Sequence, residues 1–326
     1  MLRRLVAASL AAGCATACSR PVKTARVSSI EPPAAEELDA EVALRERSCD
    51  PRLGFLFPGL AQLCLGKKAE GAALATLGVA EVGTAITVAV KTGDGSHPGV
   101  ALPVGAVQDL YAYGISDAAI TVALARRQKF APRDSMADLV AAPFNGQVLK
   151  RPAVWLGILG TLAVGLSVTL ALSDDVDTEK VGDDPNLFGE VVDRRWGYPA
   201  AGATGMVFFS HVAVGEEALF RGYIQSGLSR SSGENTGWVA ASLLFGAAHI
   251  PNMYALPEED RGEYLLYGLP IITAAGFYLG WVYRDSGYSL APSTAVHFWY
   301  DLLLSAVVFS LEPQNSILGT SVEMNF

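Results

Sequence analysis

AVWLGILGTLAVGLSVTLAL, residues 153–172, contains no charged side chain over a length that suits one crossing of a bilayer. A transmembrane helix needs about 20 mostly apolar residues. The chain of 326 residues is rich in apolar residues, since 51% of its residues are hydrophobic and only 17% are charged. A soluble domain of ordinary composition has about 25% charged residues. The composition therefore predicts a membrane protein.

Six further apolar stretches are long enough to cross the bilayer, and most of them carry ionisable residues. They are residues 71–90, 100–125, 198–223, 237–257, 264–283 and 289–311. Residues 53–65 are too short for a full span and are broken by Pro58-Gly59, so we expect a short or re-entrant segment there. The fold class predicted from these stretches is an all-α, polytopic transmembrane helical bundle of about seven or eight spans after an N-terminal signal segment.

The Lys and Arg residues of short loops predict the orientation of such a bundle. If residues 53–65 cross the membrane, the basic groups at 67–68, 126–151, 230 and 284 all fall on the cytoplasmic side. The acidic loop at 174–193 then faces outward, although Arg194, Arg195 and Arg261 lie on the opposite side from the other basic residues. We expect a multi-pass protein of the bacterial inner membrane, in contact with the lipid bilayer.

The N-terminus has the pattern of a bacterial signal peptide. Residues 1–18 contain a basic start, a short apolar region and small residues before Cys14, which makes Cys14 a candidate for lipidation; an uncleaved anchor is the alternative. Residues 19–50 are polar and rich in Pro, Ala and Glu, which is typical of a disordered linker.

Two function classes are disfavoured by composition. The four cysteines, Cys14, Cys18, Cys49 and Cys64, form no Cys-x-x-Cys and no Cys/His zinc spacing, so a cysteine metal site is not expected. The formal net charge of -9 and the lack of a basic stripe argue against nucleic acid as a partner.

The remaining chain divides into two groups of hydrophobic segments. Residues 51–135 hold the first group, whose role the sequence does not define, and residues 150–312 hold the second. Residues 57–71 are similar to the Pro-Gly-Leu-Gly-Gln pattern of small two-span bacterial membrane modules, and we interpret them as a glycine-rich helix-packing segment.

The second group contains three polar clusters, and ionisable groups at membrane depth are rarely present without a function. The first cluster is Glu216-Glu217-Ala-Leu-Phe-Arg221. Glu217 and Arg221 are four residues apart and can pair on one helix face, so we assign them a supporting role. Glu216 points about 100° away and has no neighbouring cation in the sequence. A carboxylate in apolar surroundings can act as a general base or acid, and we predict Glu216 as the catalytic one.

The other two clusters each place a histidine four residues from a partner. Phe245 precedes His249 and is expected to pack beside its imidazole, whereas His297 and Asp301 share one helix face. An imidazole and a polar neighbour can orient water or stabilise an oxyanion.

Metal binding is the alternative use of these residues. Glu216, His249 and His297 match the ligand types of a hydrolytic zinc site, so zinc or another divalent metal is a possible cofactor. No His-Glu-x-x-His and no Gly-x-Ser-x-Gly motif is present. We interpret His211 as a packing residue and His97 as a loop residue.

Together, Glu-Glu-x-x-x-Arg, Phe-x-x-x-His and His-x-x-x-Asp in membrane helices resemble the signature of the CPBP family, the CAAX-protease and bacteriocin-processing proteins, also called the Abi family. The resemblance covers roughly residues 150–312. It implies an intramembrane endopeptidase in which Glu216 and His249 activate water while His297 and residue 301 lie at the oxyanion side. The eukaryotic CAAX enzymes usually have Asn where this chain has Asp301, and the family is described both as metalloprotease and as glutamate-dependent without metal.

The main hypothesis is an endopeptidase that hydrolyses a peptide bond of a peptide or membrane-protein substrate by Glu/His-activated water. A catalytically inactive membrane scaffold or bacteriocin self-immunity protein is the alternative. A transporter with a proton relay is a third hypothesis, which the lack of repeated, interrupted halves disfavours.

Overall fold

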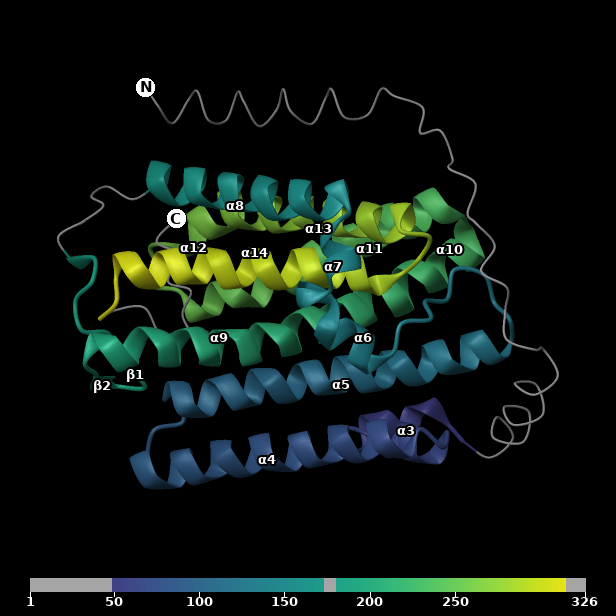
Figure 1. Cartoon of the computed structure of the whole chain (residues 1–326), viewed down its shortest axis with the longest axis horizontal. Coiled ribbons are helices and arrows are strands. Elements are labelled where there is room, and N and C mark those ends of the chain that lie inside the picture. The colour runs from purple at the N-terminus through teal and green to yellow at the C-terminus, as the bar shows by residue number, and fades with distance from the viewer. Residues whose placement is uncertain (1–48, 173–179, 315–326) are drawn as a thin grey trace.

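The structure is a computed structural model that describes residues 49–172 and 180–314. The predicted signal peptide, Cys14 and the linker up to residue 48 lie outside these residues, as does the first part of the acidic loop. The described chain is built of helices, which confirms the predicted all-α class (Figure 1).

The long helices are α4 (Lys68–Thr92), α5 (Pro98–Ala125), α8 (Pro152–Leu172), α9 (Arg194–Glu216), α11 (Glu234–Ala248), α13 (Leu269–Asp285) and α14 (Leu290–Leu311). The short α-helices are α3 (Leu60–Cys64), α6 (Met136–Ala141), α7 (Gly146–Leu149), α10 (Ser226–Ser232) and α12 (Arg261–Glu263). Two segments are π-helical, η4 (Glu217–Gln225) and η6 (Tyr264–Gly268). The 3-10 turns are η1 (Pro51–Phe55), η2 (Ala142–Phe144) and η5 (Ile250–Ala255).

The long helices run side by side along the long axis of the molecule (Figure 1). Contacts link α4 to α5, α5 to α9, α9 to α14 and α14 to α8, and α11 packs on α13. The main core lies between these layers and includes Leu110, Val214, Phe245 and Val296. Helix α5 also contacts η4, so the two hydrophobic halves of the chain share one packed bundle.

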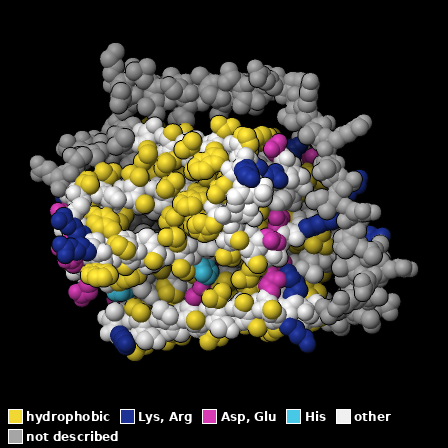
Figure 2. Space-filling model, viewed as in Figure 1, with side chains coloured by type: hydrophobic (Ala, Val, Ile, Leu, Met, Phe, Trp, Pro, Cys, Tyr) yellow, Lys and Arg dark blue, Asp and Glu magenta, His cyan; other side chains and the backbone are white. Residues whose placement is uncertain are grey.

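Three helical segments of the described chain are long and apolar enough to cross a membrane: Lys68–Thr92, Arg261–Asp285 and Leu290–Leu311. Pro152–Ser167 is a shorter apolar helix. Hydrophobic side chains cover much of the face seen in Figure 2, and charged side chains gather at its left edge and on its right side. This distribution fits a protein embedded in a bilayer.

The only strands among the described residues are β1 (Asn186–Leu187) and β2 (Glu190–Val191), which pair antiparallel. Phe188 and Gly189 connect them with φ values of 54° and 90°. Two consecutive residues with positive φ are required by a type I′ turn, which is the favoured two-residue hairpin connection. This small hairpin precedes α9 and leads the chain into it.

Residues 53–65 do not cross the bundle. They form the end of η1, a turn and the five-residue α3, and a helix of that length rises only about 7.5 Å. Gly59 turns the chain with φ 89°, and a Cβ there would meet the carbonyl oxygen of Gly71 at 2.2 Å. The expected glycine-rich packing is therefore present. Residues 53–65 do not form the membrane crossing on which the predicted orientation depends.

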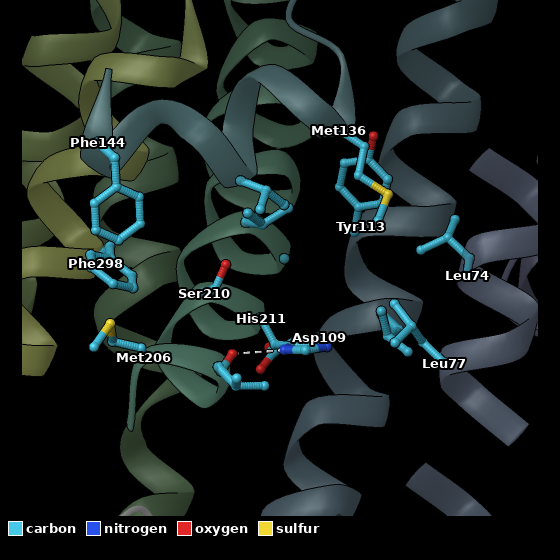
Figure 3. Close-up of a pocket in the computed structure, with 15 residues that line it drawn as sticks. Leu74, Leu77, Asp109, Tyr113, Met136, Phe144, Met206, Ser210, His211 and Phe298 are labelled. Carbon is cyan, nitrogen blue, oxygen red and sulfur yellow. Dashed lines mark hydrogen bonds between the residues drawn. The ribbon is translucent and has the colours of Figure 1, made fainter. Parts of the chain in front are cut away.

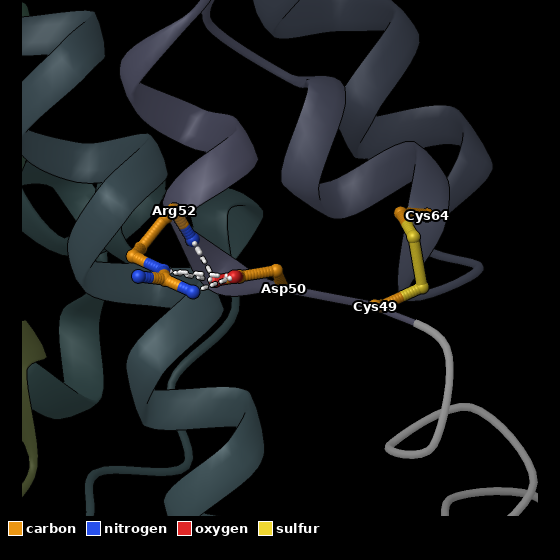
Figure 4. The surroundings of a disulfide bond; sticks show 4 residues. All are labelled: Cys49, Asp50, Arg52 and Cys64. Atoms are coloured by element: carbon orange, nitrogen blue, oxygen red, sulfur yellow. Dashed lines mark hydrogen bonds and ion pairs between the residues drawn. A yellow bond between two sulfur atoms is a disulfide. The ribbon is translucent and has the colours of Figure 1, made fainter.

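A disulfide joins Cys49 to Cys64 at the same end of the bundle (Figure 4). It ties the segment before η1 to the end of α3, beside the exposed Asp50–Arg52 ion pair. The sequence interpretation gave these two cysteines no role. Disulfides persist in oxidising compartments. The disulfide therefore favours an oxidising environment for this end, whereas its many Lys and Arg residues favour the inner side of a membrane.

A buried polar network fastens α3 and α4 to α5. The Asp117 carboxylate accepts hydrogen bonds from Lys67 Nζ at 2.5 Å and from Gln62 Nε2 at 3.0 Å. Lys67 also pairs with Glu70 at 2.7 Å, and Glu70 accepts a hydrogen bond from the Tyr113 hydroxyl. Because the Gln62 and Asp117 side chains are almost fully buried, each depends on these partners for its polar atoms.

We predict that Asp117→Ala lowers the free energy of unfolding by about 2 kcal/mol. The substitution removes two charge-assisted hydrogen bonds, from Lys67 and from Gln62, and the buried Gln62 amide group loses one of its acceptors. Denaturant titration in detergent micelles measures the change. Lys91→Ala, at an exposed position on α4, is the control and should stay within about 0.5 kcal/mol of the unmodified protein. Equal stability of the two variants would contradict the structural role of the network.

Candidate active site

The first cluster lies where α9 changes from α-helical to π-helical geometry. Glu216 is the last residue of α9, and Glu217 begins the nine-residue η4. π-Helical segments are rare and are found frequently at functional sites. The wider turn begins between the two glutamates, so their side chains leave the helix toward different surroundings.

Glu216 lies between the two histidines of the other clusters. Its Oε1 is 3.9 Å from His249 Nε2, and its Oε2 is 3.7 Å from His297 Nε2. Both separations exceed a hydrogen bond and leave room for a bridging water molecule. The side chains of Glu216 and His249 are 21% and 19% exposed. The predicted catalytic pair is thus both close together and accessible.

Glu217 is fully buried and contacts two groups. Its Oε1 is 3.6 Å from an Arg221 guanidinium nitrogen and 3.1 Å from His297 Nδ1. Pairing with Arg221 was expected from the spacing of the two residues. The contact with His297 was missed, because 80 residues separate the partners and no local pattern connects them.

Phe245 covers one side of the site. Its ring centroid is 4.7 Å from that of His249 and 5.9 Å from that of His297. The Arg221 guanidinium carbon lies 4.5 Å from the same ring, which gives a cation–π contact. The expected packing of Phe245 beside His249 is observed, and the ring additionally touches Arg221 and His297.

The orientation of His249 is set by the backbone. Its Nδ1 lies 2.8 Å from the carbonyl oxygen of Phe245, an acceptor, so Nδ1 donates and the neutral ring has its lone pair on Nε2. Nε2 is the nitrogen that faces Glu216. The Tyr264 hydroxyl donates to the His249 carbonyl oxygen at 2.7 Å, a support from η6 that the sequence did not indicate.

His297 has a carboxylate on each side. Nδ1 faces Glu217, and Nε2 faces Asp301 Oδ2 at 3.3 Å. The predicted i, i+4 pairing of His297 and Asp301 is therefore present. Each ring nitrogen faces an acceptor and can donate to it, so the ring is suited to act as a hydrogen-bond donor.

The donor types at this site would suit zinc, but their arrangement does not fit a metal centre. No group of three or more His, Cys, Asp or Glu side chains in the described part of the chain is placed to hold a metal ion. His297 directs Nδ1 at one carboxylate and Nε2 at another. The ligand set Glu216, His249 and His297 stays a prediction that this geometry does not support.

The two remaining histidines have defined partners. His97 caps α5, accepting from the Gly99 backbone N–H at Nδ1 and facing the Phe188 carbonyl at Nε2. His211 was interpreted as a packing residue, and this is incomplete. Its Nε2 is 3.1 Å from Glu81 Oε1, so it forms an ionisable pair between α9 and α4. The sequence gave no signal for this pair, because Glu81 is an isolated acid in an apolar stretch.

Comparison with known proteins agrees with the motif analysis. Residues 198–303 match the family model "Type II CAAX prenyl endopeptidase Rce1-like". This segment matches the CPBP/CAAX protease family. It is about a third of the chain, runs from α9 into α14 and contains all three polar clusters. No curated protein and no solved structure matches the chain.

We predict that substitutions of Arg221 and Glu216 change the free energy of unfolding by very different amounts. Arg221→Ala leaves the buried Glu217 carboxylate without its cation, so the free energy of unfolding should fall by about 3–5 kcal/mol. Glu216→Gln is nearly isosteric at a partly exposed position and should change stability by less than about 1 kcal/mol. Denaturant titration in micelles tests both; comparable losses would contradict the division into supporting and reactive residues.

Proposed function

We propose that this chain is an intramembrane endopeptidase that hydrolyses a peptide bond with water activated by Glu216 and His249. The observation that carries the proposal is the position of the Glu216 carboxylate, within 3.9 Å of His249 Nε2 and 3.7 Å of His297 Nε2, in a partly exposed site. The family match supports peptide-bond hydrolysis as the reaction class.

The proposed reaction begins with a water molecule between Glu216 and His249. Glu216 accepts a proton from the water, and the His249 Nε2 lone pair accepts a hydrogen bond from its other O–H. The water oxygen attacks the peptide carbonyl carbon, and negative charge develops on the carbonyl oxygen. When the C–N bond breaks, Glu216 returns its proton to the leaving amine, which balances the reaction.

His297 has the role of oxyanion donor in this proposal. Its Nε2–H lies on the Glu216 side of the site, and Glu217 at Nδ1 fixes the ring plane. A positioned donor of this kind typically contributes 10²–10³-fold to the rate. Asp301 Oδ2 lies 3.3 Å from the same nitrogen and attracts its N–H electrostatically, without having to donate a hydrogen bond itself.

We propose a multi-pass arrangement in the bacterial inner membrane, with α4, α5, α8, α9, α11, α13 and α14 as seven spans. Three of these segments meet length and hydropathy requirements on their own. Helix α5 and the segment η4 carry acidic residues that are buried inside the bundle, namely Asp109, Asp117 and Glu217. Ionisable residues of transmembrane helices usually face the bundle interior in this way.

We predict that Glu216→Gln and His249→Ala each reduce cleavage of an apolar reporter peptide by about 10²–10⁴-fold, the contribution typical of general acid–base groups. Purified protein in micelles and mass spectrometry of the products provide the measurement. Both variants should elute as the unmodified protein does in size-exclusion chromatography. Undiminished cleavage by both variants would contradict the proposal. If the unmodified protein is folded but cleaves no peptide, the result would favour the scaffold alternative.

The same assay addresses the metal question. Cleavage that continues at an undiminished rate in excess chelator supports water activation by Glu216 and His249 alone. A rate lost in chelator and restored by added zinc would instead assign Glu216, His249 and His297 as ligands.

We predict that Asp301→Asn retains cleavage within about tenfold, because the amide oxygen is still an acceptor that can face His297 Nε2. Asp301→Leu removes the acceptor beside His297 Nε2. Because His297 is then less well oriented as the oxyanion donor, kcat should fall by about 10²-fold. The KM should change little in either variant. If Asp301→Asn were as inactive as the Leu variant, the carboxylate charge itself would be required.

A further inference from the structure

A cavity of about 390 Å³ lies beside the Glu216 site, between the α4–α5 hairpin and helices α9 and α14. Figure 3 shows Leu74 and Leu77 of α4 on one side and Phe298 of α14 on the opposite side. Val214 and Gly215, which immediately precede Glu216, also line it. Its size is within the range of about 300–1,000 Å³ typical of ligand pockets.

The cavity and the site share two helices, α9 and α14. Gly215 precedes Glu216 on α9, and Phe298 follows His297 on α14. A molecule held in this cavity would therefore lie against the backbone that carries the proposed base and the proposed oxyanion donor.

Asp109 of α5 is the one acidic residue of a mostly apolar lining, whose other polar members are Tyr113, Ser210 and His211 (Figure 3). It is only 8% exposed, and its carboxyl group makes no hydrogen bond or ion pair with any residue in the described ranges. The main chain of Asp109 approaches helix α9 so closely that a Cβ on Gly215 would lie 2.6 Å from the Asp109 carbonyl oxygen. A buried polar group without a partner is costly and calls for an explanation.

The neighbouring histidine does not satisfy Asp109. His211 also lines the cavity, but its Nδ1 faces the Val207 carbonyl oxygen at 2.8 Å and its Nε2 faces Glu81 at 3.1 Å. Both ring nitrogens already have acceptors. The Asp109 carboxyl oxygens therefore remain open toward the cavity.

The chemistry of the cavity restricts what it can hold. Apolar walls favour an apolar occupant, and the open oxygens of Asp109 require a hydrogen-bond donor from that occupant. A peptide that is unwound for cleavage exposes backbone N–H groups, and each unsatisfied N–H in an apolar medium costs several kcal/mol. A hydrocarbon chain of a lipid has no such donor and would leave Asp109 unsatisfied.

We propose that this cavity binds the unwound, apolar segment of the substrate beside the scissile bond, with Asp109 accepting a hydrogen bond from a backbone N–H of that segment. Substrate specificity then depends on a residue of α5, which precedes the family-matched residues 198–303. The inference rests on the proposed peptidase function and adds the substrate segment that the site takes.

Binding to an inactive protein tests the proposal separately from catalysis. The probe is a fluorescent 20-residue Leu/Ala peptide with a central Gly-Gly pair, and Kd is measured by anisotropy with the full-length Glu216→Gln protein in nanodiscs. Adding Asp109→Leu should weaken binding about tenfold, whereas Asp109→Asn, which keeps an acceptor oxygen, should bind within about threefold of the parent.

A matched pair of variants on α4 tests the same proposal if the Asp109 variants are poorly folded. Leu77→Phe extends a cavity-lining side chain into the cavity and should also weaken binding about tenfold. Val79→Phe, on the same helix at a position 64% exposed, should leave Kd unchanged. Unchanged binding by folded Asp109→Leu and Leu77→Phe overturns the proposal.

Competition with oleic acid separates the peptide from a lipid occupant. Displacement of the peptide by oleic acid with equal potency in the Asp109→Leu and parent proteins would assign the cavity to a hydrocarbon chain and overturn the proposal. Weak competition supports it. Cleavage of the probe by Glu216→Gln, detected by mass spectrometry, would refute the peptidase mechanism, whereas unchanged binding of intact probe by Asp109→Leu would refute only the binding proposal, so the two failures are distinguishable.

Discussion

The buried Glu217 carboxylate is the contact on which the site depends. It lies against the Arg221 guanidinium on its own helix and against His297 Nδ1 of α14, with no exposure to solvent. A charge in that position is stable only when a cation and hydrogen-bond donors surround it. The requirement draws η4 and α14 together, and it fixes the His297 ring that faces Glu216.

Arg221 transmits this constraint to the third helix of the site. Its guanidinium is fully buried and lies over the Phe245 ring, so α11 is held against η4 by a cation–π contact. Phe245 in turn contacts His249 through its ring and accepts from its Nδ1 through its carbonyl oxygen. One buried ion pair thus positions both histidines relative to Glu216, while Glu216 itself stays partly accessible.

The sequence predicted the elements of the site better than their connections. Apolar stretches of helical length predicted the all-α class, and i, i+4 spacing predicted the pairs Glu217–Arg221 and His297–Asp301, because both follow from local helix geometry. The contact of Glu217 with His297 and that of His211 with Glu81 join helices far apart in the chain, and periodicity carries no information on such pairs. The π-helical geometry of η4 was missed for a related reason, since tertiary packing rather than residue preference selects it.

The close approach of α5 and α9 at Gly215 has a consequence for sequence variation. Any side chain at this position would overlap Asp109, since an added Cβ would lie 2.6 Å from the Asp109 carbonyl oxygen. A contact this close forces the neighbouring backbone to move, and Glu216 is the next residue of the same helix. The glycine therefore bears on the position of Glu216 as well as on the packing of α5 against α9.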